Sequence, residues 1–145
     1  MPAVVDLLRR KGRVVHTISP TDSVVAAATA MNQHGVGGLV VVDSEGQLVG
    51  MFTERDILRR VVAPGRDPAT TVVGEVMTTE VLACQPETSL EECAAVMTSK
   101  RIRHLPVRDR QGLVGIVTIG DLLAQQVDDQ RATIQYLTSF VYDNR

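Results

Sequence analysis

The sequence contains no tryptophan, and aromatic residues make up only 3% of its 145 residues. Its core must therefore be built from valine, leucine, isoleucine, alanine and methionine, which suits packed helices and largely buried strands. No apolar run approaches the roughly 18–20 residues that a membrane-spanning helix needs. The start also lacks the basic-then-apolar layout of an export signal. We therefore expect no membrane partner.

Strong charge and cysteine clusters are also missing. The formal net charge of -2 gives no reason to expect a nucleic-acid partner. The two cysteines, Cys84 and Cys93, form neither a CxxC motif nor a Cys/His cluster, so we predict no metal site and no disulfide framework. A reduced cytoplasm is then the expected location. The 44% apolar and 22% charged content is that of a globular protein.

An internal repeat is the main positive feature of the sequence. Residues 15–46 align with 81–112 at a shift of 66, and residues 48–58 align with 113–123 at a shift of 65. The single unmatched residue, Gln47, stands in a Gly-containing turn, where a duplicated sequence tolerates a gap. The sequence therefore predicts two related units.

Each unit has the pattern β-α-β-β-α. Turn signals and apolar periodicity predict a first strand, a helix with one buried stripe, a β-hairpin and a last helix that starts near Asp56 or Asp121. The predicted strands are 14–18, 39–42 and 48–53 in the first unit and 81–84, 105–107 and 113–118 in the second. The first helix of each unit should be capped by Thr21/Asp22 or by Thr88.

These elements predict an α/β (α+β) fold in which two pseudo-two-fold-related units pack sheet to sheet. A unit of about 55 residues is marginal alone, and pairing covers its open sheet face. Lead-in helices are expected at 4–8 and 73–77. We divide the chain into 1–66, 67–127 and a C-terminal helix, 128–145.

Each unit also carries a Thr-x-x-Asp motif where its second hairpin strand meets its last helix. Together with segment 103–107 (Arg-His-Leu-Pro-Val) and segment 76–78 (Val-Met-Thr), the repeated motif resembles a tandem pair of CBS domains, also called a Bateman module, over roughly residues 4–127. The resemblance implies an adenosine-containing ligand (AMP, ADP, ATP, NAD or S-adenosylmethionine) in clefts between the units. It also implies a homodimer and a stand-alone sensor that acts on an effector protein.

The candidate ligand contacts begin with the two motifs. Asp56 and Asp121 can each accept hydrogen bonds from two ribose hydroxyls. Thr53 and Thr118 stand at the strand-to-helix turn, where hydroxyl and N–H groups can meet a phosphate. The alternative is that both aspartates are only helix caps.

The two units differ where phosphate would bind. The resemblance makes Arg103 and His104 phosphate candidates and places the neighbouring Pro106 in the same segment. The first unit has Gly37 and Gly38 there, which offer N–H groups and room but no charge, so we predict two unequal clefts. Arg103 could instead lie on a solvated strand edge. Met51 borders the first motif and can touch a base.

Basic residues at the ends of predicted helices have a simpler interpretation. Lys11, Arg59 and Arg60 fit favourable contact with the helix dipole.

The overall hypothesis is a non-catalytic sensor of adenine nucleotides. Alternatives are an enzyme that acts on a nucleotide, a nucleic-acid-binding regulator, and a structural dimerisation module. The sequence shows neither a catalytic triad nor a P-loop, which argues against an enzyme.

Overall fold

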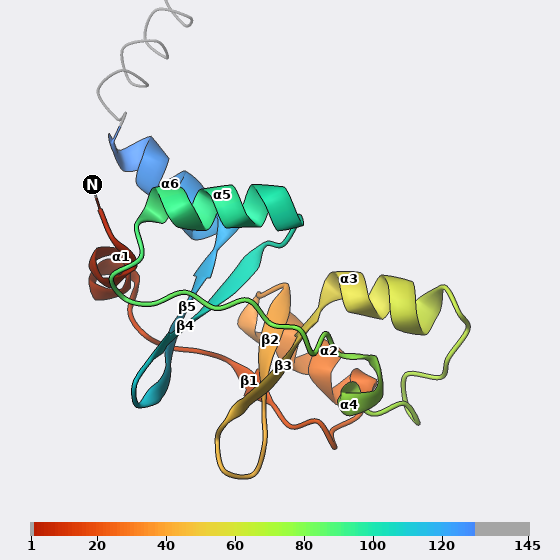
Figure 1. Cartoon of the computed structure of the whole chain (residues 1–145). Helices are drawn as coiled ribbons and strands as arrows, with labels where there is room; N and C mark the ends of the chain where they lie inside the picture. Colours follow the sequence, from red (N-terminus) through yellow and green to blue (C-terminus); the bar gives the residue numbers. More distant parts are fainter. Residues whose placement is uncertain (1, 130–145) are drawn as a thin grey trace, which may run out of the picture.

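The computed structural model describes residues 2–129, arranged as two α/β halves side by side (Figure 1). Most of the C-terminal helix predicted for 128–145 lies outside the described residues. Within these residues, no helix combines the length and the apolar character that crossing a bilayer requires. The predicted mixed fold of two repeated units is confirmed.

The first half contains all the elements predicted for a unit. A three-stranded sheet has the order β1-β2-β3, in which β1 is parallel to β2 and β2 is antiparallel to β3. Its elements are β1 (Thr17–Ile18), α2 (Val24–His34), β2 (Gly38–Val42), β3 (Leu48–Thr53), α3 (Glu54–Asp56) and the π-helix η1 (Ile57–Val62). The first strand is shorter than the predicted 14–18, and Val14 is 71% exposed.

The second half repeats this order with one difference. It contains α5 (Leu90–Lys100), β4 (His104–Asp109), β5 (Gly112–Thr118) and α6 (Ile119–Asp129), with β4 antiparallel to β5. The strand predicted at 81–84 is reduced to a single bridge between Cys84 and Val107. Residues 80–82 line the cleft between the halves.

The main helices of the two halves begin and end at matching positions. Ser23 and Ser89 are the N-caps, with side chains that accept hydrogen bonds from the N–H groups of Ala26 and Glu92. The predicted caps were therefore displaced by one or two residues. Gly35 ends α2 with a φ of 64°, as its position predicts. Arg101 ends α5 with a φ of 56°, a conformation that favours glycine.

The two lead-in helices cross over to the opposite halves. Helix α1 (Val4–Lys11) precedes the first half in sequence, but Val4, Leu7 and Leu8 are buried in the core of the second. Helix α4 (Val73–Val76) packs in the same manner in the core of the first half. Figure 1 shows α1 beside β4 and β5, with α4 close to α2. This exchange ties the two halves together.

Each crossing is tightly fitted at a glycine. A Cβ added to Gly115 of β5 would lie 2.8 Å from Cδ2 of Leu8, and one added to Gly50 of β3 would lie 2.5 Å from Sδ of Met77. Only a residue without a side chain allows such an approach. Leu8 and Met77 therefore occupy corresponding places in the two halves.

Candidate functional site

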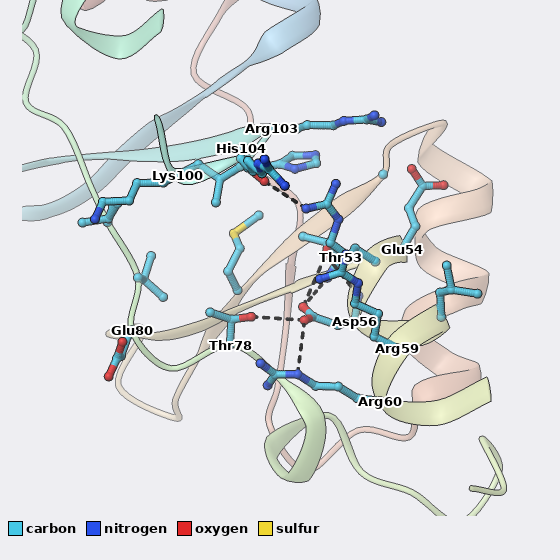
Figure 2. A pocket seen from close by; sticks show the side chains of 18 residues that line it. Thr53, Glu54, Asp56, Arg59, Arg60, Thr78, Glu80, Lys100, Arg103 and His104 are labelled. Atoms are coloured by element: carbon cyan, nitrogen blue, oxygen red, sulfur yellow. Dashed lines mark hydrogen bonds and ion pairs between the residues drawn. The ribbon is translucent and has the colours of Figure 1, made fainter. Parts of the chain in front are cut away.

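The main cleft lies between the two halves and has a volume of about 610 Å³. The first half contributes the end of β3, the turn of helix α3 and the start of η1, while the second contributes residues 100–104. Segment 78–82, which follows α4, lines it as well. Figure 2 shows Arg103 and His104 on one side of this cleft and Asp56, Thr78 and Arg60 on the other.

Asp56 is the most strongly held polar group of the cleft. The residue is 7% exposed. Oδ2 of its carboxylate accepts hydrogen bonds from the backbone N–H of Thr53 at 3.0 Å and from the hydroxyl of Thr53 at 3.3 Å. On the other oxygen, Oδ1, it accepts a hydrogen bond from the hydroxyl of Thr78 at 3.1 Å, and Nε of Arg60 lies at 3.8 Å. These contacts fix the carboxylate on the cleft wall, where lone pairs of Oδ1 can accept further hydrogen bonds.

Asp56 does act as a helix-capping residue at the first motif, as the alternative interpretation of the sequence proposed. Thr53 is the N-cap of α3, and its side chain and that of Asp56 form the reciprocal hydrogen bonds of a capping box. Thr118 and Asp121 make the same pair of bonds, at 2.9 and 3.2 Å. Capping uses one oxygen of each carboxylate. It orients the side chain without excluding a ligand from the other oxygen.

Positive charge predominates around the main cleft. Six basic residues and three carboxylates line it: Arg55, Arg59, Arg60, Lys100, Arg101 and Arg103 against Glu54, Asp56 and Glu80. Arg55 donates to the carbonyl of Arg101 at 3.0 Å and so joins the two halves across the cleft. Within the described residues, the side chains of Arg59, Lys100 and Arg103 make no ion pair or hydrogen bond, so their charges are available to an anion.

His104 lies at the back of the cleft, where the two sheets meet. Its ring is within 3.1–3.2 Å of where a Cβ on Gly38 would stand, so the imidazole fills the space that this glycine leaves. Burial lowers the pKa of His104, and the nearby positive charges of Arg103 and Lys11 lower it further, whereas Glu54 and Asp121 oppose the shift. A mainly neutral imidazole at pH 7 is a hydrogen-bonding group more than a cation for phosphate.

The second motif is arranged differently. Asp121 lies outside the main cleft, on a surface hollow of about 360 Å³ that also involves Leu7, Lys11 and Ala124. The ammonium group of Lys11 lies 2.6 Å from its Oδ2 and 2.9 Å from the carbonyl oxygen of Ile116. This carboxylate therefore has a cationic partner supplied by α1.

The structure brings together six of the ten residues predicted for the site. These line the main cleft: Gly37, Met51, Thr53, Asp56, Arg103 and His104. The other four lie elsewhere. Thr118 and Asp121 belong to the second motif, Gly38 is buried beneath His104, and Pro106 is buried in β4, where its carbonyl accepts a hydrogen bond from Cys84.

Several cleft residues were not predicted from the sequence. Thr78 was noted only as part of a motif, and its contact with Asp56 spans 22 positions that no local pattern relates. Arg59 and Arg60 were interpreted only as helix-end charges, as was Lys11, which lies outside this cleft at the hollow beside Asp121. Arg60 donates to the carbonyls of Val76 and Met77, so it binds α4 in addition to lining the cleft. The available signal was Arg55 inside the first Thr-x-x-Asp motif and Arg59 and Arg60 just after it.

Both cysteines lie away from the cleft. Cys84 and Cys93 are free thiols buried in the core of the second half. The hydrogen bond that the Cys84 thiol donates to Cys93, together with burial, raises the pKa of Cys84, so it is a poor nucleophile. In the part of the chain that the structure describes, no cluster of three or more His, Cys, Asp or Glu residues could hold a metal ion.

The fold and the cleft define a class of protein in which two repeated α/β units enclose a cleft between them. The family model of the CBS domain matches residues 4–63 and 73–128. A CBS domain-containing protein of Bacillus subtilis, YhcV, is 45% identical over 118 residues, which cover 81% of this chain and 83% of that protein. The chain therefore belongs to the CBS domain family.

Solved structures agree with this membership. A putative signal-transduction protein with CBS domains from Burkholderia ambifaria has a TM-score of 0.85 and 39% identity, over 89% of this chain and 96% of that one. The CBS domain pair of protein MJ0100, in complex with 5′-methylthioadenosine and S-adenosyl-L-methionine, has a TM-score of 0.79 and 27% identity, over 89% and 98%. CBS domain pairs are typically regulatory modules.

Proposed function

We propose that this chain is a non-catalytic sensor that binds an adenine nucleotide, of the AMP, ATP or NAD type, in the main cleft. One observation supports this most strongly. Asp56, from the first half, and Arg103, from the second, line the same cleft. A group that accepts from ribose hydroxyls and a group that binds phosphate are thereby presented by different units to one ligand.

The remaining lining fits the other parts of such a ligand. Met51 and Leu82 provide apolar surface for a base, and Leu82 is 44% exposed. Arg59, Lys100 and Arg103, whose side chains have no ion pair in the described part of the chain, suit a phosphate chain. Complexes of a solved CBS pair with two adenosine compounds support the choice of adenine.

A ligand that contacts both halves can change how the halves pack against each other. A ligand changes a conformational equilibrium only by its different affinities for the two states. A nucleotide that contacts both halves favours the packing in which Asp56 and Arg103 stand at the right separation. An effector protein that recognises this packing would then respond to the nucleotide. A reducing, cytoplasmic setting is part of this proposal because both thiols are free and buried.

A second copy of the chain is the proposed partner of two apolar stripes. Leu58 and Val62 of η1 are 61% and 62% exposed, and Leu123 and Val127 of α6 are 55% and 51% exposed. The two pairs correspond at the repeat shift of 65. Two matching stripes on pseudo-symmetric helices suit a two-fold homodimer, in which the same surface is used by both copies.

A nucleotide panel tests the proposal directly. The purified chain is heated with adenosine, AMP, ATP, NAD, S-adenosylmethionine and, as a base control, UTP. A ligand at 100 times its Kd adds about 2.7 kcal/mol to the free energy of unfolding, which is a clear shift in Tm. We expect stabilisation by at least one adenine nucleotide and little by UTP. No shift with any adenine compound would favour a structural dimerisation module, and turnover of ATP or NAD would favour an enzyme.

A further inference from the structure

The aspartate of the second motif, Asp121, is bound by the side chain of Lys11 from the same chain. Lys11, the last residue of α1, places Nζ 2.6 Å from Oδ2 of Asp121 and 2.9 Å from the carbonyl oxygen of Ile116. The side chains of Lys11 and Asp121 are only 27% and 21% exposed. An ammonium has three N–H donors, and two of them are used here inside the protein.

The first motif has a different partner because the lead-in segments differ in length. Helix α4 stops at Val76, and Met77 is extended, whereas α1 continues three residues beyond Leu8 to Lys11. Leu8 and Met77 occupy corresponding places against Gly115 and Gly50. Three residues after them stand Lys11 and Glu80, which are therefore corresponding positions in the two lead-in segments. Glu80 lines the main cleft and makes no ion pair within the described residues.

We propose that Lys11 closes the second motif and so determines which of the two sites accepts a nucleotide. This rests on the proposed function of the main cleft. A ribose hydroxyl is a neutral donor, and a carboxylate bonds a cation more strongly. Lys11 binds Oδ2, the oxygen that also accepts the capping hydrogen bond, so a ligand that approaches Oδ1 of Asp121 meets a carboxylate already neutralised by an ammonium group beside it. The chain should therefore bind one nucleotide, beside Asp56.

Binding stoichiometry gives the first test, with ATP as the probe in isothermal titration calorimetry. The wild-type chain should bind one ATP. Lys11→Met keeps the length of the side chain and removes the charge, so a second ATP should bind at the freed Asp121. Arg9→Met is the matched control: Arg9 lies on the same helix with its side chain 72% exposed, and among the described residues its one ion pair is with Asp6 at 3.8 Å. It should stay at one ATP, and Lys11→Arg should do the same.

A second test needs no nucleotide. The chain has two lysines, Lys11 and Lys100. Acetylation with a limiting amine reagent, followed by peptide mass spectrometry, should modify Lys100 at least several times faster than Lys11. In Asp121→Asn, the rate at Lys11 should rise toward that of Lys100. Folding of each variant is checked by its circular dichroism spectrum and Tm.

The outcomes separate this inference from the function on which it rests. Two ATP molecules per wild-type chain would overturn the closure while leaving the nucleotide sensor intact. A Lys11→Met chain that folds and still binds one ATP would also overturn it, because the ion pair would then only anchor α1. Equal acetylation of the two wild-type lysines would contradict the closed geometry whether or not ATP binds. Failure of every adenine compound to bind would overturn the proposed function itself.

Discussion

His104 packs against Gly38, and the ring fills the place where any other residue at position 38 would carry its side chain. A Cβ on Gly38 would stand 3.1 Å from Nε2 of His104. The two residues are separated by the repeat shift of 66, so they occupy corresponding positions where the halves meet. One imidazole is thus enclosed between the two sheets, and its protonation is coupled to their packing.

This enclosure predicts a pH dependence of stability. Burial lowers the pKa of His104 in the folded state, while its unfolded pKa is about 6.5. Below about 6.5 the unfolded chain takes up this proton and the folded chain resists it, so the free energy of unfolding falls as the pH decreases. Arg103 and Lys11 strengthen this effect, and Glu54 and Asp121 weaken it.

The measurement is urea unfolding of wild type and His104→Gln between pH 5 and 8. We expect the wild type to lose stability below about pH 6.5 more steeply than the variant, and the two curves to run parallel above that pH. His16 and His34 are present in both proteins and cancel in the comparison. Identical pH profiles would show that the imidazole titrates as if exposed.

Arg103 should contribute to the binding of phosphate and not of the nucleoside. Arg103→Gln removes a cation that has no partner within the described residues, so it should weaken ATP binding on the order of tenfold, or about 1.4 kcal/mol. Adenosine binding should change little. Calorimetry with both ligands gives the comparison.

Arg110→Gln is the control for this experiment. Arg110 lies in the turn between β4 and β5 and is not part of the cleft lining. It changes the net charge of the chain by the same amount. If both variants weaken ATP binding equally, the effect comes from the overall electrostatic field of the chain, and Arg103 makes no specific contact with ATP. If Arg103→Gln weakens adenosine as much as ATP, the assignment of the phosphate position is wrong.

The exposed stripes should hold the homodimer together. Leu58→Glu and Leu123→Glu each place a charge in the proposed interface and should raise the dimer Kd at least roughly tenfold. Sedimentation velocity over a range of protein concentrations measures this. Val14→Glu is the control, since Val14 is 71% exposed but lies outside the stripes. Monomeric wild type at all concentrations would rule out this interface.

The repeat predicted most of the fold because its signals are local. Apolar spacing, Gly35 at a helix end and the paired Thr-x-x-Asp motifs all depend on neighbours within one turn or one hairpin. The two-unit architecture and the position of the main helices followed from them. The strand predicted at 81–84 is reduced to one bridge, and Val81 and Leu82 line the cleft between the halves, a placement that a local apolar pattern does not reveal.

The crossing of the lead-in helices limited what could be predicted for the site. Periodicity shows that α1 has an apolar side, but not which half buries it. Lys11 meets Asp121 across 110 positions, and Thr78 meets Asp56 across 22. Those contacts depend on the tertiary packing of α1 and α4. The sequence thus identified two similar aspartates, whereas packing makes their surroundings unequal.

The central claim is that Asp56 holds the ribose of an adenine nucleotide in the cleft between the halves. Asp56→Asn keeps a side-chain oxygen for the cap and removes the charge, and Asp121→Asn makes the same change at the second motif. We predict that calorimetry will show a 10–150-fold loss of ATP affinity in Asp56→Asn, corresponding to about 1.5–3 kcal/mol, and nearly wild-type affinity in Asp121→Asn. Unchanged ATP affinity in a folded Asp56→Asn chain would contradict the account.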